Sequence, residues 1–109
     1  MRYTTELHLH VMTDRSDDSF DKHTDEVLDA LMDLNNVIDP DLTVNLSRRA
    51  VIISMIVEAS DAGEAVGHAF TSVRAAIHQV GGWTPGWEDA IRDAVANSAP
   101  VGADDCVDA

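Results

Sequence analysis

Positive charge is scarce in this sequence of 109 residues, where 7 lysine and arginine residues stand against 20 aspartate and glutamate residues. The formal net charge is −13. Such a charge repels the phosphates of nucleic acids and anionic lipid headgroups at long range. We therefore expect no direct nucleic-acid partner and no membrane partner. The same excess of acid suits high solubility, a basic protein partner, bound cations or life at high salt, and composition does not separate these.

Cysteine and long apolar runs are also scarce. The single cysteine, Cys106, permits no disulfide within the chain and no thiolate metal cluster. The first ten residues contain no apolar signal core, and no window reaches the length of a membrane span. We therefore expect a cytoplasmic protein. The length suits one domain with its own core, and we predict an α+β domain over residues 1–97 with an acidic disordered tail over 98–109.

Three stretches have the pattern of strands. Ala50–Ala59 carries apolar side chains on both faces, which is typical of a central strand. Residues 3–12 and 42–46 alternate between apolar and polar side chains, which predicts strands with one buried face. Only residues 47–49 separate the third stretch from the central strand. The two must therefore form an antiparallel hairpin.

Two longer stretches have the spacing of amphipathic helices. The first is predicted to begin near Ser19 and to end near Asn35. The second follows the capping residues Ser60 and Asp61 and ends at the glycine pair 81–82. A short third helix is predicted around Trp87.

The order strand, helix, strand, strand, helix resembles the ferredoxin-like, or split βαβ, family of folds without its last strand. The resemblance implies a three-stranded antiparallel or mixed sheet with two helices on one face, followed by the short C-terminal helix. The first strand would then have an unpaired edge, and Ile52 and Ile56 would lie on the open face of the sheet. A second copy of the chain or residues 83–97 can cover that edge. We predict a homodimer, and no activity follows from this fold alone.

The first candidate site is a metal site on the first predicted strand. Glu6, His8 and His10 alternate along the sequence and therefore share one face, ~6 to 7 Å apart from one to the next. Two imidazoles and a carboxylate suit a divalent metal such as zinc. A complete site needs a further ligand, from Glu58 or from a histidine of a second copy. A solvated or interfacial polar face is the simpler interpretation.

The second candidate site is an acidic stripe on the first predicted helix. Four aspartates recur every fourth residue and therefore lie on one helix face. An acidic face of this kind can bind a basic protein partner, although acidic faces are commonly no more than solvated. The stripe consists of Asp21, Asp25, Asp29 and Asp33.

Four polar residues of the second predicted helix form no recognisable catalytic pattern. His68, Thr71, Ser72 and His78 lie on its polar side, and no neighbour in the sequence completes a dyad or triad. We interpret them as surface residues.

Taken together, these patterns predict a small acidic binding protein that is homodimeric, has no catalytic residues and needs no cofactor. In this hypothesis the acidic helix face meets a basic protein partner. The alternative is a metal-binding protein or an enzyme built on His8 and His10. Neither hypothesis identifies a ligand.

Overall fold

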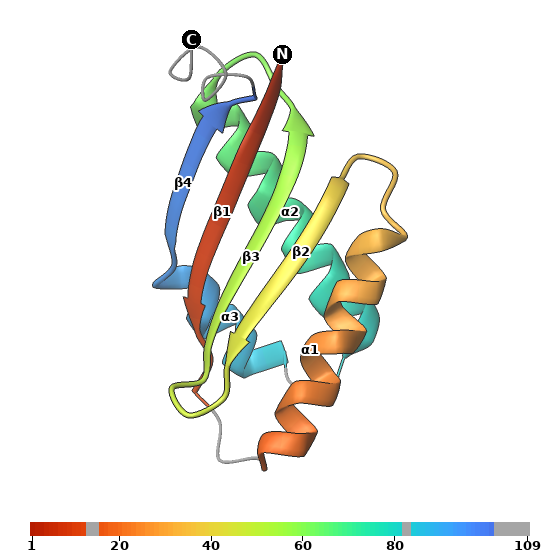
Figure 1. Ribbon diagram of the computed structural model, residues 1–109, viewed down its shortest axis with the longest axis vertical. Helices are drawn as coiled ribbons and strands as arrows, with labels where there is room; N and C mark the ends of the chain where they lie inside the picture. Colours follow the sequence, from red (N-terminus) through yellow and green to blue (C-terminus); the bar gives the residue numbers. More distant parts are fainter. Residues whose placement is uncertain (13–15, 82–83, 102–109) are drawn as a thin grey trace, which may run out of the picture.

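We describe residues 1–12, 16–81 and 84–101 of a computed structural model. In this part of the chain, four strands form one sheet, and three helices lie together on one of its faces (Figure 1). None of these helices combines the length and the apolar character that a membrane span requires. Along the chain the elements are β1 (Arg2–His10), α1 (Asp17–Met32), β2 (Ile38–Asn45), β3 (Ala50–Glu58), α2 (Ala62–Val80), α3 (Thr84–Arg92) and β4 (Val95–Pro100).

The strand order is β2-β3-β1-β4, and each pair of neighbours is antiparallel. β3 lies between β1 and β2, as its apolar side chains on both faces predicted. The short hairpin between β2 and β3 is also present. The α+β, ferredoxin-like fold class predicted from the sequence is therefore confirmed.

The prediction that the last strand is missing was wrong. β4 pairs with β1 from Val95 opposite His8 to Pro100 opposite Tyr3, so the edge of β1 is not bare (Figure 1). The sequence of β4, VANSAP, has one β-branched residue and a proline, so its intrinsic strand preference is weak. Its backbone pairing with β1 decides its conformation.

The predicted tail overlaps this strand. Residues 98–100 belong to β4, whereas residues 102–109, with Cys106, lie outside the described residues. The division into a domain and a disordered tail therefore stays a prediction. Trp83 also lies outside the described residues.

The hydrophobic core fills the space between the sheet and the helices. Alternate side chains of β1 and β3 point toward the helices and are buried, and each large one stabilises the fold by about 1.5 to 3 kcal/mol. α2 faces the sheet with alanines, and these small side chains let the helix approach closely. The principal core residues are Leu7, Leu9, Phe20, Val27, Leu31, Val51, Ile53, Met55, Val57, Ala65, Ala69 and Val73.

Capping residues fix where the two long helices begin. Ser16 caps α1 by accepting a hydrogen bond from the backbone N–H of Ser19 at 3.2 Å. The helix therefore begins earlier than the sequence pattern predicted. Asp61 caps α2 by accepting a hydrogen bond from the N–H of Glu64 at 2.8 Å, which confirms the predicted cap.

The other face of the sheet carries no helix in the described part of the chain (Figure 1). Ile52 and Ile56 lie half-buried there, beside the polar side chains of Glu6 and His8. An isolated pair of isoleucines in a polar surround is a modest apolar area. The open face of the sheet therefore still favours a homodimer. The edge of β1 no longer does, because β4 covers it.

Candidate active site

A cleft of about 330 Å³ opens at the end of β3 where the chain enters α2. Its walls come from the loop after α1, the first residue of β2, the last residue of β3 and the first half of α2. This size is at the lower end of the range for small-molecule sites. The lining residues are Asn35, Asn36, Ile38, Glu58, His68 and Thr71.

The helical repeat of α2 brings its polar residues to the cleft. Because residues three and four apart share a helix face, Glu64, His68 and Thr71 follow one another along one side of α2. Ser72, one residue further on, is buried, with 2% of its surface exposed. The cap at Asp61 therefore also fixes the positions of these side chains.

His68 is held in a single tautomer by the end of β3. Its Nδ1 lies 3.2 Å from the main-chain carbonyl oxygen of Glu58. A carbonyl oxygen can only accept a hydrogen bond, so Nδ1 carries the proton and the neutral ring keeps its lone pair on Nε2. The side chain is 47% exposed, which leaves it accessible to a ligand in the cleft. This arrangement gives an imidazole that can accept a proton at Nε2.

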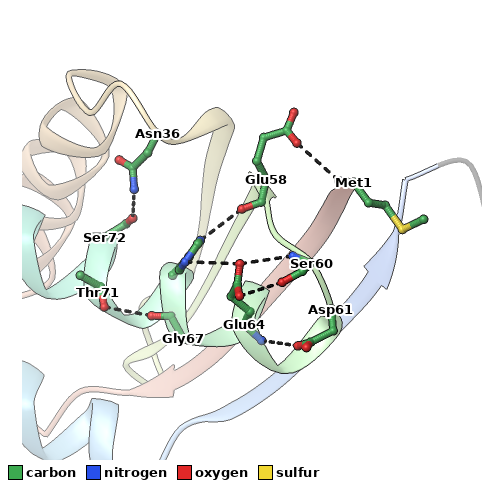
Figure 2. Close-up of polar contacts among 10 residues, drawn as sticks. Met1, Asn36, Glu58, Ser60, Asp61, Glu64, Gly67, Thr71 and Ser72 are labelled. Atoms are coloured by element: carbon green, nitrogen blue, oxygen red, sulfur yellow. Dashed lines mark hydrogen bonds and ion pairs between the residues drawn. The ribbon is translucent and has the colours of Figure 1, made fainter.

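Glu64 places a carboxylate beside that nitrogen. Its Oε1 lies 3.9 Å from Nε2 of His68, which is ion-pair distance when the imidazole is protonated. The carboxylate is fixed by two hydrogen bonds from Ser60, one from the backbone N–H at 3.2 Å and one from the hydroxyl at 2.8 Å (Figure 2). Glu64 thus caps the helix and is also placed to stabilise an imidazolium.

Two further side chains of the cleft are held by hydrogen bonds. Asn36 donates from Nδ2 to the hydroxyl oxygen of Ser72 at 3.3 Å, which ties the loop after α1 to α2 (Figure 2). Thr71 donates its hydroxyl proton to the carbonyl oxygen of Gly67 at 3.0 Å. Both contacts restrict side chains that border the cleft.

The strand that borders the cleft is irregular. The pairing of β2 with β3 shifts between Ile38 and Asp41, and Asp39 adopts a positive φ of 48°. Aspartate tolerates this left-handed conformation better than most residues do. Irregular strand pairing is common beside active sites, where it redirects a side chain. Here it coincides with Ile38, the apolar residue of the cleft.

The glutamate at the end of β3 is partly neutralised. One oxygen of the Glu58 carboxylate lies 3.1 Å from Nε of Arg2, and the other lies 3.6 Å from the amino group of Met1. The carboxylate of Glu64 has no such lysine or arginine partner among the described residues. The cleft therefore lies beside two carboxylates, and the two cationic groups near it, from Arg2 and Met1, both pair with Glu58.

Sequence reasoning did not find this site. His68, Thr71 and Ser72 were interpreted as surface residues because no side chain near them in the sequence completes a catalytic pattern. The partner that orients His68 is a backbone carbonyl, which leaves no mark on the sequence. The one local signal was Glu64, four residues before His68 and three after the cap Asp61.

The residues of the predicted metal site lie on the open face of the sheet. Glu6 and His8 are neighbours, with Oε1 and Nε2 3.3 Å apart, and His10 is exposed. Among the described residues, no three histidine, cysteine, aspartate or glutamate side chains are grouped so that they could hold a metal ion. An ion here would need a ligand from a second chain, and the zinc site stays a prediction.

The acidic stripe is where the sequence placed it. All four aspartates, Asp21, Asp25, Asp29 and Asp33, are exposed on α1 or at its end. Their role in binding a partner is not tested by the structure. The stripe ends at Asp33, two residues before Asn35 of the cleft.

Comparison with solved structures gives matches along nearly the whole chain. The structural-genomics protein YJCS superposes with a TM-score of 0.59 at 14% identity, covering 93% of this chain and 99% of that one. A protein assigned as an antibiotic biosynthesis monooxygenase from Nitrosomonas europaea matches with a TM-score of 0.49 at 12% identity, covering 90% and 88%. SnoaB, a cofactor-independent oxygenase from Streptomyces nogalater, matches with 0.43 at 9% identity and the same coverage. No protein-family model and no curated protein sequence matches.

These comparisons contradict the hypothesis of a non-catalytic binding protein. None of the sequence patterns used for that hypothesis distinguishes a binding protein from an enzyme on this fold. At these identities the likeness to YJCS establishes the fold alone.

Proposed function

We propose that this protein is an enzyme that converts a small organic molecule in the cleft, with His68 as its general base. One observation carries the proposal: the hydrogen bond from Nδ1 to the Glu58 carbonyl leaves the lone pair on Nε2 of a half-exposed imidazole. A general base needs this combination of a fixed tautomer and access to the substrate. Glu64 then stabilises the imidazolium that forms when the proton is taken.

The surroundings of His68 support the same function. The side chains of Asn36 and Thr71 are held in place by hydrogen bonds, so they can orient a substrate without losing much side-chain freedom. Ile38 supplies an apolar wall for the carbon skeleton. A site of this kind needs no metal ion to bind and deprotonate a substrate.

The reaction to assay first is oxidation by dioxygen, because two proteins similar in structure are described as oxygenases. The test is oxygen uptake by the metal-free protein with a panel of oxidisable small organic molecules. We expect the variant His68→Gln to lose about 100-fold or more of any turnover, the usual effect of removing a general base. The matched control is His78→Gln on the same helix, because His78 lies outside the cleft and glutamine can still donate to its partner Glu88.

Two outcomes would contradict the proposal. Turnover that is equal in the wild-type protein and in His68→Gln would place the base elsewhere. A panel without any turnover, combined with no change in the NMR signals of His68 on adding the compounds, would remove the cleft as a substrate site.

We also propose that the protein is a homodimer and that it is cytoplasmic. The open face of the sheet, with Ile52 and Ile56, supports assembly as a homodimer through that face. The lone cysteine in the sequence supports a cytoplasmic location. Neither is needed for the chemistry at His68, which lies on the helical side of the sheet.

A further inference from the structure

The hydrogen bonds around the cleft leave mainly acceptor atoms for a ligand. His68 donates from Nδ1 to Glu58 and keeps an acceptor at Nε2. Thr71 donates its only hydroxyl proton to Gly67 and keeps oxygen lone pairs. Asn36 turns its Nδ2 toward Ser72, and its carboxamide oxygen has no hydrogen-bond partner among the described residues.

Three side chains that line the same cleft therefore each keep an acceptor, and one functional group offers only donors. A protonated primary amine has three N–H donors and no acceptor, whereas a carboxylate or phosphate offers acceptors only. A hydroxyl group can donate one hydrogen bond and leaves two of the three acceptors unmatched. The remaining N–H groups of Asn35 and Asn36 are available for another polar group of the ligand.

The charge of the cleft favours the same group. The Glu64 carboxylate lies 3.9 Å from Nε2 of His68, and it has no lysine or arginine partner in the described part of the chain. The Glu58 carboxylate is shared with Arg2 and the Met1 amino group. The whole chain carries a formal charge of −13, which attracts cations and repels anions at long range.

We propose that the cleft binds a small primary amine in its protonated form, with the ammonium group against His68, Thr71 and Asn36 and the carbon skeleton against Ile38. The inference rests on the proposed function of the same cleft and adds the class of substrate. Glu64 supplies the opposite charge. A carboxylate in place of the amine finds no donor at His68, Thr71 or the Asn36 oxygen and is repelled by the negative charge.

The test is an NMR titration of the full-length protein with three probes of similar size: benzylamine, benzyl alcohol and benzoate. We expect benzylamine to shift the backbone signals of His68 and Thr71 and the side-chain amide signals of Asn36. We expect it to bind about 10-fold or more tightly than the alcohol, because the alcohol lacks the charge and two of the donors. Benzoate should leave these signals in place.

Two variants test the contacts. Glu64→Gln removes the charge, while its single carboxamide oxygen keeps the hydrogen bond from the Ser60 backbone N–H and its NH₂ group donates to the Ser60 hydroxyl oxygen. Thr71→Val removes one acceptor at an exposed position. Each should weaken benzylamine binding about 3-fold to 10-fold, as expected for the loss of one charged or polar contact. The control Asp25→Asn removes a carboxylate from the exposed stripe on α1 and should leave the affinity unchanged.

The outcomes separate the two proposals. Equal or tighter binding of benzoate or benzyl alcohol at His68, Thr71 and Asn36 would overturn the amine and leave the cleft as a substrate site. Benzylamine shifts spread over the aspartates of α1, and reduced by Asp25→Asn, would show attraction to the net charge alone and would also overturn the amine. No shift at the cleft with any probe would contradict the amine and the proposed function together.

Discussion

The guanidinium of Arg49 lies over the ring of Phe20, with Cζ 5.1 Å from the ring centroid. Nη1 of the same guanidinium lies 2.6 Å from Oδ1 of Asp17 and also donates to the carbonyl oxygen of Leu46. Arg49 therefore ties the hairpin between β2 and β3 to the first turn of α1. It does so from a backbone conformation with a positive φ of 53°, in a turn that contains no glycine.

Replacing Arg49 should lower stability more than replacing its neighbour. We expect Arg49→Met to reduce the free energy of unfolding by about 2 kcal/mol, since it removes a charged hydrogen bond and a cation–π contact at a side chain that is 18% exposed. The measurement is urea denaturation near neutral pH. The control is Arg48→Met, an exposed neighbour whose change should stay within about 0.5 kcal/mol. Equal losses for the two variants would show that the contacts of Arg49 contribute nothing.

Glu88 should stabilise the protein in a pH-dependent way. The hydrogen bond from Nε2 of His78 at 3.0 Å, and then the charge of Arg74 at 3.4 Å, hold the pKa of the Glu88 carboxyl below its ordinary value of 4.5. A carboxyl group whose pKa is lower in the folded state stabilises that state above its unfolded pKa. The contribution is lost as the pH falls through the folded pKa.

We therefore expect Glu88→Gln to be less stable than the wild-type protein near neutral pH and to approach it as the pH falls below 4.5. Denaturation midpoints measured along a pH series provide the check. Asp89→Asn is the control, because Asp89 is exposed and pairs with the exposed Arg92 three residues further on. A difference for Glu88→Gln that does not shrink in acid would contradict the assigned cause.

Trp87 is fully buried, yet its indole N–H has no hydrogen-bond partner among the described residues. A buried donor without a partner costs about 1 to 3 kcal/mol. The ring of Trp87 lies 5.9 Å from that of His23. We expect Trp87→Phe to lose only about 1 kcal/mol, because it removes this penalty while keeping an aromatic ring at that place. Trp87→Ala should lose about 3 to 5 kcal/mol. Thermal or urea unfolding that gives similar losses for both variants would mean that the N–H has an acceptor, such as a buried water.

The elements with strong periodicity could be predicted from the sequence. Ala50–Glu58 has apolar residues on both faces, and only a central strand buries both, so its place in the sheet followed from its composition. Asp61 and the alanine-rich face of α2 likewise fixed the start and the buried side of that helix. These features are local, and each is visible within one stretch of sequence.

β4 and the cleft could not be predicted in the same way. Val95–Pro100 becomes a strand because β1 offers it backbone partners, and its own residues have weak strand preference. The orientation of His68 depends on the carbonyl of Glu58, ten residues earlier in the chain. Both depend on contacts that arise only when distant segments meet, so periodicity and local spacing carry no information about them.

The open face of the sheet should form a homodimer interface. Ile52 and Ile56 lie on this face, and a charge introduced there would be buried in the interface without a partner. We expect the wild-type protein to be a dimer in sedimentation analysis and Ile56→Asp to be a folded monomer. The control Ala75→Asp adds the same charge to the exposed side of α2 and should remain dimeric. A monomeric wild-type protein would contradict the homodimer.

The zinc site predicted from Glu6, His8 and His10 should depend on that dimer. One chain does not group three ligand side chains in its described part, and two histidines on a strand leave zinc short of its usual four ligands. A second copy facing the same sheet surface would supply the others. We therefore expect zinc added to the chelator-treated protein to be retained on the dimer and not on the monomer in native mass spectrometry. His10→Asn should lose the metal while His78→Asn, on the opposite side of the sheet, keeps it. Zinc that stays on a monomer, or that survives His10→Asn, would show that the ion is held by other residues.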